Sequence, residues 1–267
     1  MNKRNTIIAI TTFLIIGLAA CTGTAKEDAE KYRKGWSLVW EDNMDTPLDR
    51  AVWSTISRGD LAANRYMSDN EALYVPREGN LILRGVENSA NNGELPFLTG
   101  GISREGVSPG SVRRIEVRAR VNPAAGAVPY ISLVPTSGAE NITIDLMEAY
   151  GMDNFVYQSI TSEYTTTQGM PDNPPSSALV GVNPNQFHVY AVEKYPDSLV
   201  FYVDETRTRK YPRILTDIPG QFPFNNLEFN LHIGVRVNRD ARPEDMPADM
   251  FIDWVRIYEQ KVEESTE

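Results

Sequence analysis

Apolar and polar residues alternate most clearly in residues 141–151, where three aliphatic side chains alternate with Thr143 and Asp145. This period of two predicts a β-strand with one face on a hydrophobic core. Strict alternation would also place Glu148 in that core, where a charged carboxylate is not buried without a partner. We therefore predict a β-bulge at residues 146–147, which turns Glu148 onto the face that carries Thr143 and Asp145.

Similar short patterns recur along the chain and predict further strands. They lie near residues 36–42, 73–75, 81–83, 115–121, 156–163, 189–193, 199–204, 227–234 and 251–258. Pro-rich loops at 170–176 and 242–248 separate some of them, and no segment shows a long helical period. Many short strands without helices predict an all-β fold, a two-sheet antiparallel jelly-roll sandwich.

Residues 227–234 alternate in the same way as residues 141–151 and add candidates for the polar face. The aliphatic and aromatic positions of this segment are expected in the core. Glu228, Asn230 and His232 then share a face with Thr143 and Glu148 in a jelly roll. They are candidate substrate-binding residues, and the alternative is that they are ordinary polar surface residues.

The N-terminus has the features of a targeting segment. Lys3 and Arg4 precede an apolar run at residues 7–18, which is too short to span a bilayer comfortably and fits a signal peptide. Residues 18–21, Leu-Ala-Ala-Cys, resemble a bacterial lipobox. Cys21 is also the only cysteine, so a disulfide within the chain is impossible and acylation is the expected fate of the thiol. We expect a lipoprotein anchored to a membrane of the bacterial cell envelope, either periplasmic or surface-exposed.

This interpretation divides the chain into four parts. They are a signal peptide and lipobox at 1–21, a flexible polar tether at 22–34, a folded domain at 35–260 and a loose tail at 261–267. The formal net charge of −10 becomes −12 when the two cationic residues of the leader are removed. Such an acidic chain argues against nucleic acid and polyanionic substrates, and it suits neutral polysaccharide.

The strand at 143–148 resembles the catalytic strand of glycoside hydrolase family 16, which reads E-x-D-x-x-E with apolar residues at the x positions. In that family the first Glu is the nucleophile, the Asp supports it, and the last Glu is the acid/base. The resemblance implies that Asp145 and Glu148 keep these roles, whereas Thr143 occupies the nucleophile position.

The resemblance continues in order through residues 36–53, 99–103, 114–121, 186–193 and 253–258. It implies a concanavalin A-like jelly roll whose concave face holds a cleft for β-linked glycan, of the β-glucan or β-galactan class. The resemblance implies that the protein requires no cofactor. It also implies a structural Ca²⁺ on the convex side, with Asn43, Gly79 and Asp253 at the ligand positions. The alternative is that Asp253 pairs locally.

Two tryptophans of the family pattern are replaced here, by Val128 and Ser132. Because sugar rings stack on aromatic faces, the loss of these two tryptophans removes area for binding a sugar. Four tyrosines are candidates to replace the tryptophans in part, but packing is the favoured interpretation of each; they are Tyr130, Tyr150, Tyr157 and Tyr164.

Retaining hydrolysis needs two carboxyl groups about 5 Å apart. Across the bulge, Thr143 and Glu148 are roughly 13 Å apart between Cα atoms, and a threonine hydroxyl is a poor nucleophile without an adjacent base. The favoured hypothesis is a glycan-binding or hydrolytically impaired protein. A second is an altered hydrolase, with Glu148 as the acid and Asp145, Glu163 or Glu228 activating water. A third is a structural envelope lipoprotein.

Overall fold

The computed structural model describes residues 33–90, 95–108, 112–139 and 141–261. Gly35–Glu267 forms a compact unit distinct from Met1–Lys34. The expected signal peptide, Cys21, most of the tether and residues 262–267 lie outside the described residues. Within the described ranges, no helix is both long and apolar enough to cross a membrane.

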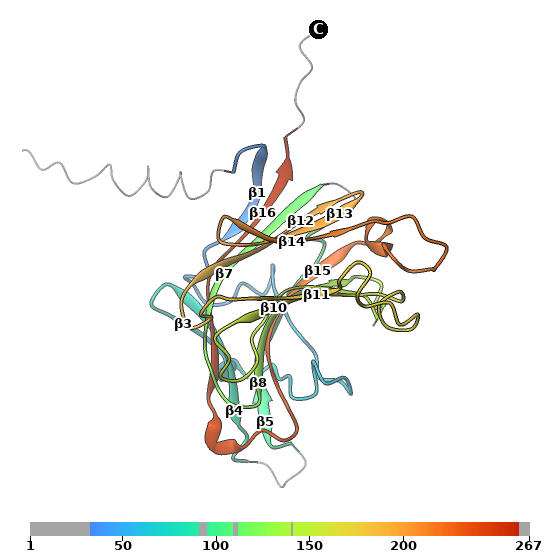
Figure 1. Ribbon diagram of the computed structural model, residues 1–267. Coiled ribbons are helices and arrows are strands. Elements are labelled where there is room, and N and C mark those ends of the chain that lie inside the picture. The colour runs from blue at the N-terminus through green and yellow to red at the C-terminus, as the bar shows by residue number, and fades with distance from the viewer. Residues whose placement is uncertain (1–32, 91–94, 109–111, 140, 262–267) are drawn as a thin grey trace, which may run out of the picture. The chain divides into compact units, whose positions relative to one another are not determined.

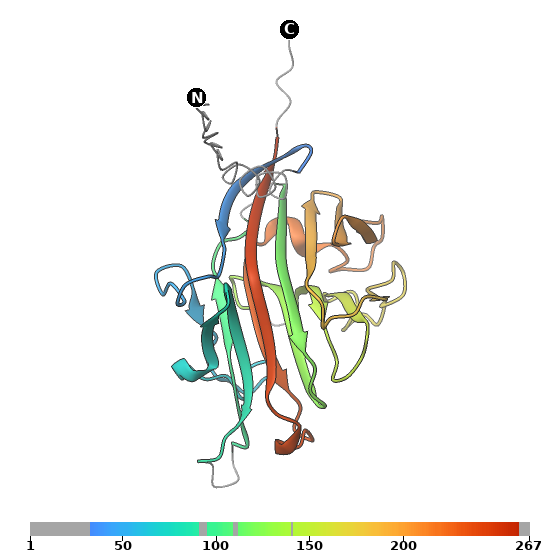
Figure 2. The ribbon, with the colours of Figure 1, turned by 90° about the vertical axis from the view of Figure 1, so that its left-hand side faces the viewer.

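Nine strands form one sheet, in the order β14-β13-β12-β7-β16-β4-β3, with β1 also paired to β16 and β5 to β4. Their bounds are β1 (Trp36–Asp42), β3 (Tyr74–Arg77), β4 (Asn80–Glu87), β5 (Phe97–Thr99), β7 (Arg113–Asn122), β12 (His188–Tyr195), β13 (Ser198–Val203), β14 (Thr206–Pro212) and β16 (Ala248–Gln260). The long β16 runs between β7 on one side and β4 and β1 on the other (Figure 2).

Seven strands form the second sheet, in the order β11-β10-β9-β8-β15-β6-β2. Their bounds are β2 (Ser54–Thr55), β6 (Gly101–Arg104), β8 (Ala127–Pro135), β9 (Thr143–Glu148), β10 (Val156–Thr161), β11 (Ser177–Val180) and β15 (Phe229–Val237). Neighbouring strands in this sheet are antiparallel. The two sheets pack against each other as the predicted all-β sandwich (Figure 1).

The core lies between the two sheets and follows the alternation of the sequence. The nine-stranded sheet contributes Val117 and Ile252, and the seven-stranded sheet contributes Ile131 and Ile233; all four are fully buried. In β15 every second side chain, from Phe229 to Val237, is buried. The intervening residues of the seven-stranded sheet therefore lie on its outer face, away from the core.

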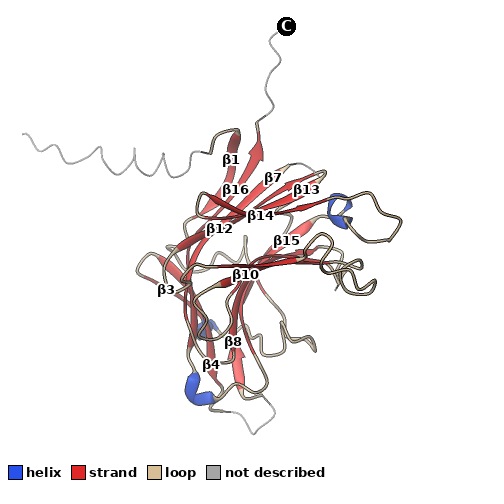
Figure 3. Ribbon diagram, in the orientation of Figure 1, coloured by secondary structure: helices blue, strands red, loops and turns tan. Residues whose placement is uncertain are grey.

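Helical structure in the described residues is limited to three short 3₁₀ turns, η1 (Glu71–Leu73), η2 (Pro223–Asn226) and η3 (Pro243–Asp245) (Figure 3). The strands predicted from the sequence are all present, with ends that differ by a few residues. The prediction did not identify β2, β5, β6, β8, β11 or β14.

Candidate functional site

The predicted bulge is present in β9. Asp145 lies opposite Ser132 of β8 and Ser159 of β10, and Glu148 lies opposite Tyr130 and Tyr157. Three residue steps in β9 therefore match two steps in each neighbouring strand, which is the count of a bulge. The extra residue lets two successive apolar side chains stay buried, and Glu148 emerges on the outer face beside Asp145.

A row of small polar residues crosses the outer face of the seven-stranded sheet through Asp145. Each member is the direct cross-strand partner of the next, and one residue comes from every strand. From β2 to β11 the row consists of Ser54, Ser103, His232, Ser132, Asp145, Ser159 and Ser177. We call this the polar row. It places hydroxyl groups, one imidazole and one carboxylate along a line perpendicular to the strands.

Asp145 is held by three hydroxyl groups. Ser132 Oγ donates to Oδ1 at 2.6 Å, and Ser159 Oγ and Thr143 Oγ1 donate to Oδ2 at 2.8 and 3.1 Å. Burial and the nearby Glu148 carboxylate raise the pKa of Asp145, and the three hydrogen bonds act in the opposite direction. Because a hydroxyl has one proton to donate and Thr143 donates it to Asp145, Thr143 helps to position that carboxylate.

Glu148 forms an ion pair that the sequence analysis missed. Its Oε1 accepts a hydrogen bond from Arg236 Nη2 at 2.8 Å, and its Oε2 accepts one from the Tyr150 hydroxyl at 3.2 Å. Burial opposes the charge of Arg236, but the Glu148 carboxylate outweighs it and leaves the pKa of Arg236 raised. Both oxygens of Glu148 are therefore already engaged, one of them by a cation.

Arg236 continues the alternation of Asn230 and His232 on the same strand. The predicted strand ended at Gly234, but β15 extends to Val237 and carries Arg236 onto the outer face. Following the alternation for one more step would have identified it.

The tyrosines considered as replacements for the missing tryptophans fall into two pairs. Tyr150 and Tyr157 pack edge to face at 5.3 Å beside Glu148. They line a depression of about 400 Å³ with Glu148, Asp153, Ser159 and Ser177. Tyr130 and Tyr164 are buried, at 6% and 1% exposure, so neither offers an open ring face. The assignment of Tyr130 as a substrate-binding residue stays a prediction.

The other candidates from residues 227–234 are spread along β15. His232 belongs to the polar row, where burial lowers its pKa to about 4, so the imidazole is neutral at pH 7. Asn230 accepts a hydrogen bond from the Gly106 N–H at 3.2 Å. Glu228 lies just before β15, where its backbone carbonyl accepts a hydrogen bond from the Thr136 N–H. The structure therefore groups His232, but not Glu228, with Asp145.

Neither alternative water-activating carboxylate reaches Glu148. Through Tyr130 of β8, Glu148 lies level with Gly234 of β15. Phe229, the residue after Glu228, is five residues from Gly234, which is roughly 16 Å along the strand. Glu163 follows Thr161, the cross-strand partner of Thr143 at the opposite end of β9 from Glu148. Inverting enzymes hold their two carboxyl groups about 6.5–9.5 Å apart, which excludes both residues. Asp145 remains, with both oxygens already accepting hydrogen bonds.

A second depression lies at the other end of the polar row. It has a volume of about 380 Å³ and is lined by Trp40, Arg50, Ala51, Val52, Trp53, Ser54, Ser103, Arg104 and Glu105. Trp36, Trp53 and Trp254 are buried as expected of core residues, but Trp40 is only partly buried. The row therefore runs from one depression to the other.

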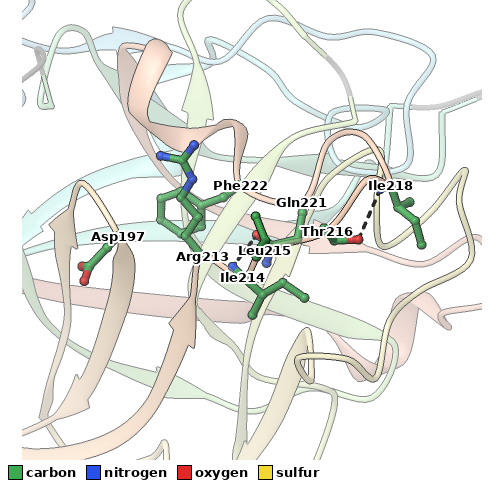
Figure 4. A pocket seen from close by; sticks show the side chains of 8 residues that line it. All are labelled: Asp197, Arg213, Ile214, Leu215, Thr216, Ile218, Gln221 and Phe222. Carbon is green, nitrogen blue, oxygen red and sulfur yellow. Dashed lines mark hydrogen bonds between the residues drawn. The ribbon is translucent and has the colours of Figure 1, made fainter.

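A third depression, of about 540 Å³, is formed by Asp197 and residues 213–222 (Figure 4). None of its lining residues belongs to the polar row. Its polar groups are used locally: Gln221 Oε1 accepts from the Ile214 N–H, and Thr216 Oγ1 accepts from the Ile218 N–H. We assign it no part in the candidate site.

The expected Ca²⁺ ligands lie on segments that the strand registers bring together, but their chemistry fits the ion poorly. Asp253 is paired with Arg118, which already neutralises its carboxylate. Within the described ranges, no group of three or more His, Cys, Asp or Glu side chains could hold a metal. The Ca²⁺ site at Asn43, Gly79 and Asp253 stays a prediction.

A melting temperature that rises with added Ca²⁺ and falls with EDTA would support this Ca²⁺ site, and a melting temperature that neither reagent changes would count against it.

The two-sheet sandwich with a polar row across one outer face places the protein in the class of antiparallel jelly rolls. The model of glycosyl hydrolases family 16 matches residues 110–256, more than half of the chain, and the chain belongs to this family. The matched segment begins just before β7 and ends within β16, so it contains the bulged strand and the residues around it.

Several known proteins are similar to this chain. A keratan-sulfate endo-1,4-β-galactosidase of Sphingobacterium multivorum is 26% identical over 84% of this chain, which spans 55% of that protein. A β-glucanase of Rhodothermus marinus is 24% identical over 93% of each chain. The solved laminarinase of Rhodothermus marinus superimposes with a TM-score of 0.72 at 21% identity, over 85% of this chain and 98% of that one. These likenesses confirm the predicted family and jelly-roll fold.

Proposed function

We propose that this family 16 protein binds β-linked polysaccharide along the polar row and does not hydrolyse it by the retaining mechanism. The observation that carries the proposal is that the residues of the catalytic motif are engaged with other side chains. The Thr143 hydroxyl donates a hydrogen bond to Asp145, and Glu148 is ion-paired with Arg236. The nucleophile position has no carboxylate, and both oxygens of the residue at the acid position already accept hydrogen bonds. The attacking group of a double displacement is therefore missing.

The same arrangement is suited to holding a sugar chain. The polar row offers hydroxyl groups and a neutral imidazole, which can exchange hydrogen bonds with sugar hydroxyls. At one end Tyr150 and Tyr157 supply apolar ring surface on which a sugar face can stack. The similar proteins include a β-glucanase and a β-galactosidase, which supports a glycan of the β-glucan or β-galactan class.

The proposal is tested by measuring binding and hydrolysis on the same samples. The full chain is run in native gels containing β-1,3-glucan, mixed-linkage β-glucan or β-1,4-galactan, and each mixture is then assayed for new reducing ends. We expect retardation by at least one polysaccharide and no reducing ends above a no-protein control. Release of reducing ends at a family-typical rate would overturn the non-hydrolytic assignment. Retardation by none of the three would favour the structural role instead.

A tyrosine variant connects binding to the site. Tyr150→Ala should weaken retardation about three- to tenfold, because it removes one face of the aromatic pair. Tyr195→Ala is the matched control, since this half-buried tyrosine lies on the nine-stranded sheet, and it should leave retardation unchanged. Equal loss in both variants would point to a general effect on folding.

A further inference from the structure

The depression at the β2–β6 end of the polar row differs in charge from the rest of the site. Its lining includes two arginines, Arg50 and Arg104, and one carboxylate, Glu105. The end near Glu148 instead combines that carboxylate with Asp153 and two tyrosines. The two ends of the row therefore present different chemistry to a chain that spans them.

Arg104 is the distinctive group of this depression. Its guanidinium lies over the Trp40 ring at 4.0 Å, and its Nη1 donates to the Glu105 carbonyl at 2.9 Å. Within the described part of the chain, its Nε has no hydrogen-bond partner although it is fully covered, and no carboxylate lies within ion-pair distance. The guanidinium therefore keeps its charge and has a backbone carbonyl as an acceptor, but it has no anionic acceptor in the described residues.

The nearest acidic groups do not supply that acceptor. Asp42 influences Arg104 only through its charge, because its oxygens accept hydrogen bonds from the Met44 N–H and the Trp53 indole. Glu105 contributes its backbone carbonyl. Arg50 is held by Glu71, but both side chains of that pair are exposed, at 40% and 82%, so the pair is weak and Arg50 can reorient.

We propose that this depression is a subsite for a single anionic substituent of the bound glycan, either a sulfate ester or a carboxylate. Arg104 donates to the anion from the stacked position on Trp40, Arg50 adds a second cation, and the Ser103 hydroxyl completes the hydrogen bonds. The proposal rests on the proposed glycan binding and names the substrate more closely. The acidic net charge of the chain still disfavours a densely charged polyanion.

The test compares matched oligosaccharides by titration calorimetry on the full chain. One is a sulfated β-galactan oligosaccharide, the second is the same compound after desulfation, and the third carries a uronate carboxylate in place of the sulfate. We expect the preferred anionic ligand to bind about tenfold more tightly than the neutral one, the size of one charge-assisted hydrogen-bond set. Whichever anionic arm is tighter identifies the substituent.

Variants assign the preference to Arg104. Arg104→Met keeps an unbranched apolar stem over Trp40 and removes the guanidinium, so the anionic and neutral ligands should bind equally. Arg104→Lys keeps the charge without the planar fork and should retain part of the preference. Arg77→Met, at an exposed pair in the β3–β4 turn, is the matched control and should behave as wild type. If the Arg104 variants fail to fold, competition by sodium sulfate in wild type, against sodium chloride of equal ionic strength, tests the same subsite.

The outcomes separate this inference from the proposed function. Equal binding of all three ligands by wild type would overturn the anionic subsite and leave glycan binding in place. Binding of none would overturn both. A preference that survives in Arg104→Met and is insensitive to sulfate would also overturn the subsite, because the anion would then be recognised elsewhere.

Discussion

Thr143 changes the chemistry of β9 more than any other residue, although it differs from the family motif by one side chain. A glutamate there would add a second acidic group beside Asp145, whereas threonine adds a third hydroxyl to its hydrogen-bond shell. The same site thus moves from two carboxylates in need of compensation to one carboxylate that is well satisfied. Arg236 completes the change, because it compensates Glu148 in the same way.

We predict that Thr143→Glu alone restores little hydrolysis, since the ion pair with Arg236 still holds the Glu148 carboxyl group. The double variant Thr143→Glu/Arg236→Met should release reducing ends from the polysaccharide that wild type binds, because it supplies a nucleophile and frees the acid. The rate of hydrolysis should remain on the order of 10²-fold below that of an efficient enzyme, since the missing tryptophans weaken positioning of the substrate. Glu148→Gln in this background should abolish it.

The control for this experiment is Thr161→Glu in the Arg236→Met background. Thr161 is the cross-strand partner of Thr143 and shares its face, so it adds the same charge one strand away. Hydrolysis by this variant would show that any carboxylate on the face suffices. Robust hydrolysis by wild type would contradict the impaired site altogether.

His232 makes the stability of the protein depend on pH. Burial lowers the pKa of its imidazole from its usual 6.5 to about 4, so between these values the unfolded chain binds a proton that the native protein does not. Its contribution to stability is therefore complete above pH 6.5 and is lost as the pH falls to 4. The full shift corresponds to about 3 kcal/mol.

We predict that His232→Asn flattens the dependence of the unfolding free energy on pH between 6.5 and 4, as measured by urea unfolding at several pH values. The only other histidine, His188, is held by Asp204 and serves as the control. His188→Asn should retain the loss of stability that His232 causes. An unchanged slope in His232→Asn would mean that other groups set the acid dependence.

At the scale of the element, alternation was sufficient where a strand has one face in the core and one outside. The strands β10 and β15 are of this kind, and their segments were predicted from period two alone. β8 was missed as a strand because both of its faces are covered: its burial is nearly continuous and gives no alternation. β2 and β11 are too short, and β14 too polar, to give a hydrophobic signal.

The bulge was predictable because it solves a physical conflict that is visible in the sequence. What the sequence did not give is the set of partners around it, since Ser132, Ser159 and Arg236 come from three different strands. The polar row likewise consists of residues that are unremarkable in their own segments. Only the cross-strand registers bring them into one line. Period two within a strand excludes a slip of one residue but does not choose between registers that differ by two residues.

We predict that deleting Met147 removes the bulge, leaves Glu148 on the outer face and destabilises the protein through the core. Asp145, Leu146 and Glu148 then alternate strictly, so Glu148 stays beside Arg236. The deletion removes one fully buried methionine side chain, which costs about 2–5 kcal/mol against a total stability of about 5–15 kcal/mol. Circular dichroism melting should show a lower transition temperature.

The control for this deletion is removal of Gly138 from the turn before β9. A shortened surface turn should cost far less than the loss of a buried core side chain. If the two deletions are equally tolerated, the bulge and its buried methionine contribute little to the stability of the protein.

At the scale of the whole molecule, Gly35–Glu267 carries the fold and the whole candidate site, and the expected leader and tether come before it. An acidic domain on a polar tether would keep its binding face accessible while the N-terminus holds it at a membrane. This division concerns residues outside the described ranges, so it stays a prediction from the sequence. Membrane anchoring can be tested separately from glycan binding at the candidate site.

We predict that Cys21 anchors the protein through lipid attached to its sulfur and its amino group. In cells of a bacterium that processes lipoproteins, the wild-type chain should partition into the detergent phase, and Cys21→Ser should move to the aqueous phase because the thiol that accepts the lipid is absent. Ser37→Ala in the folded domain is the control and should partition as wild type. Wild type and Cys21→Ser should be retarded equally in the glycan-containing gels, since the candidate site lies in the folded domain. Aqueous partitioning of wild type would refute the anchor, and detergent partitioning of Cys21→Ser would show that the uncleaved apolar segment holds the chain at the membrane.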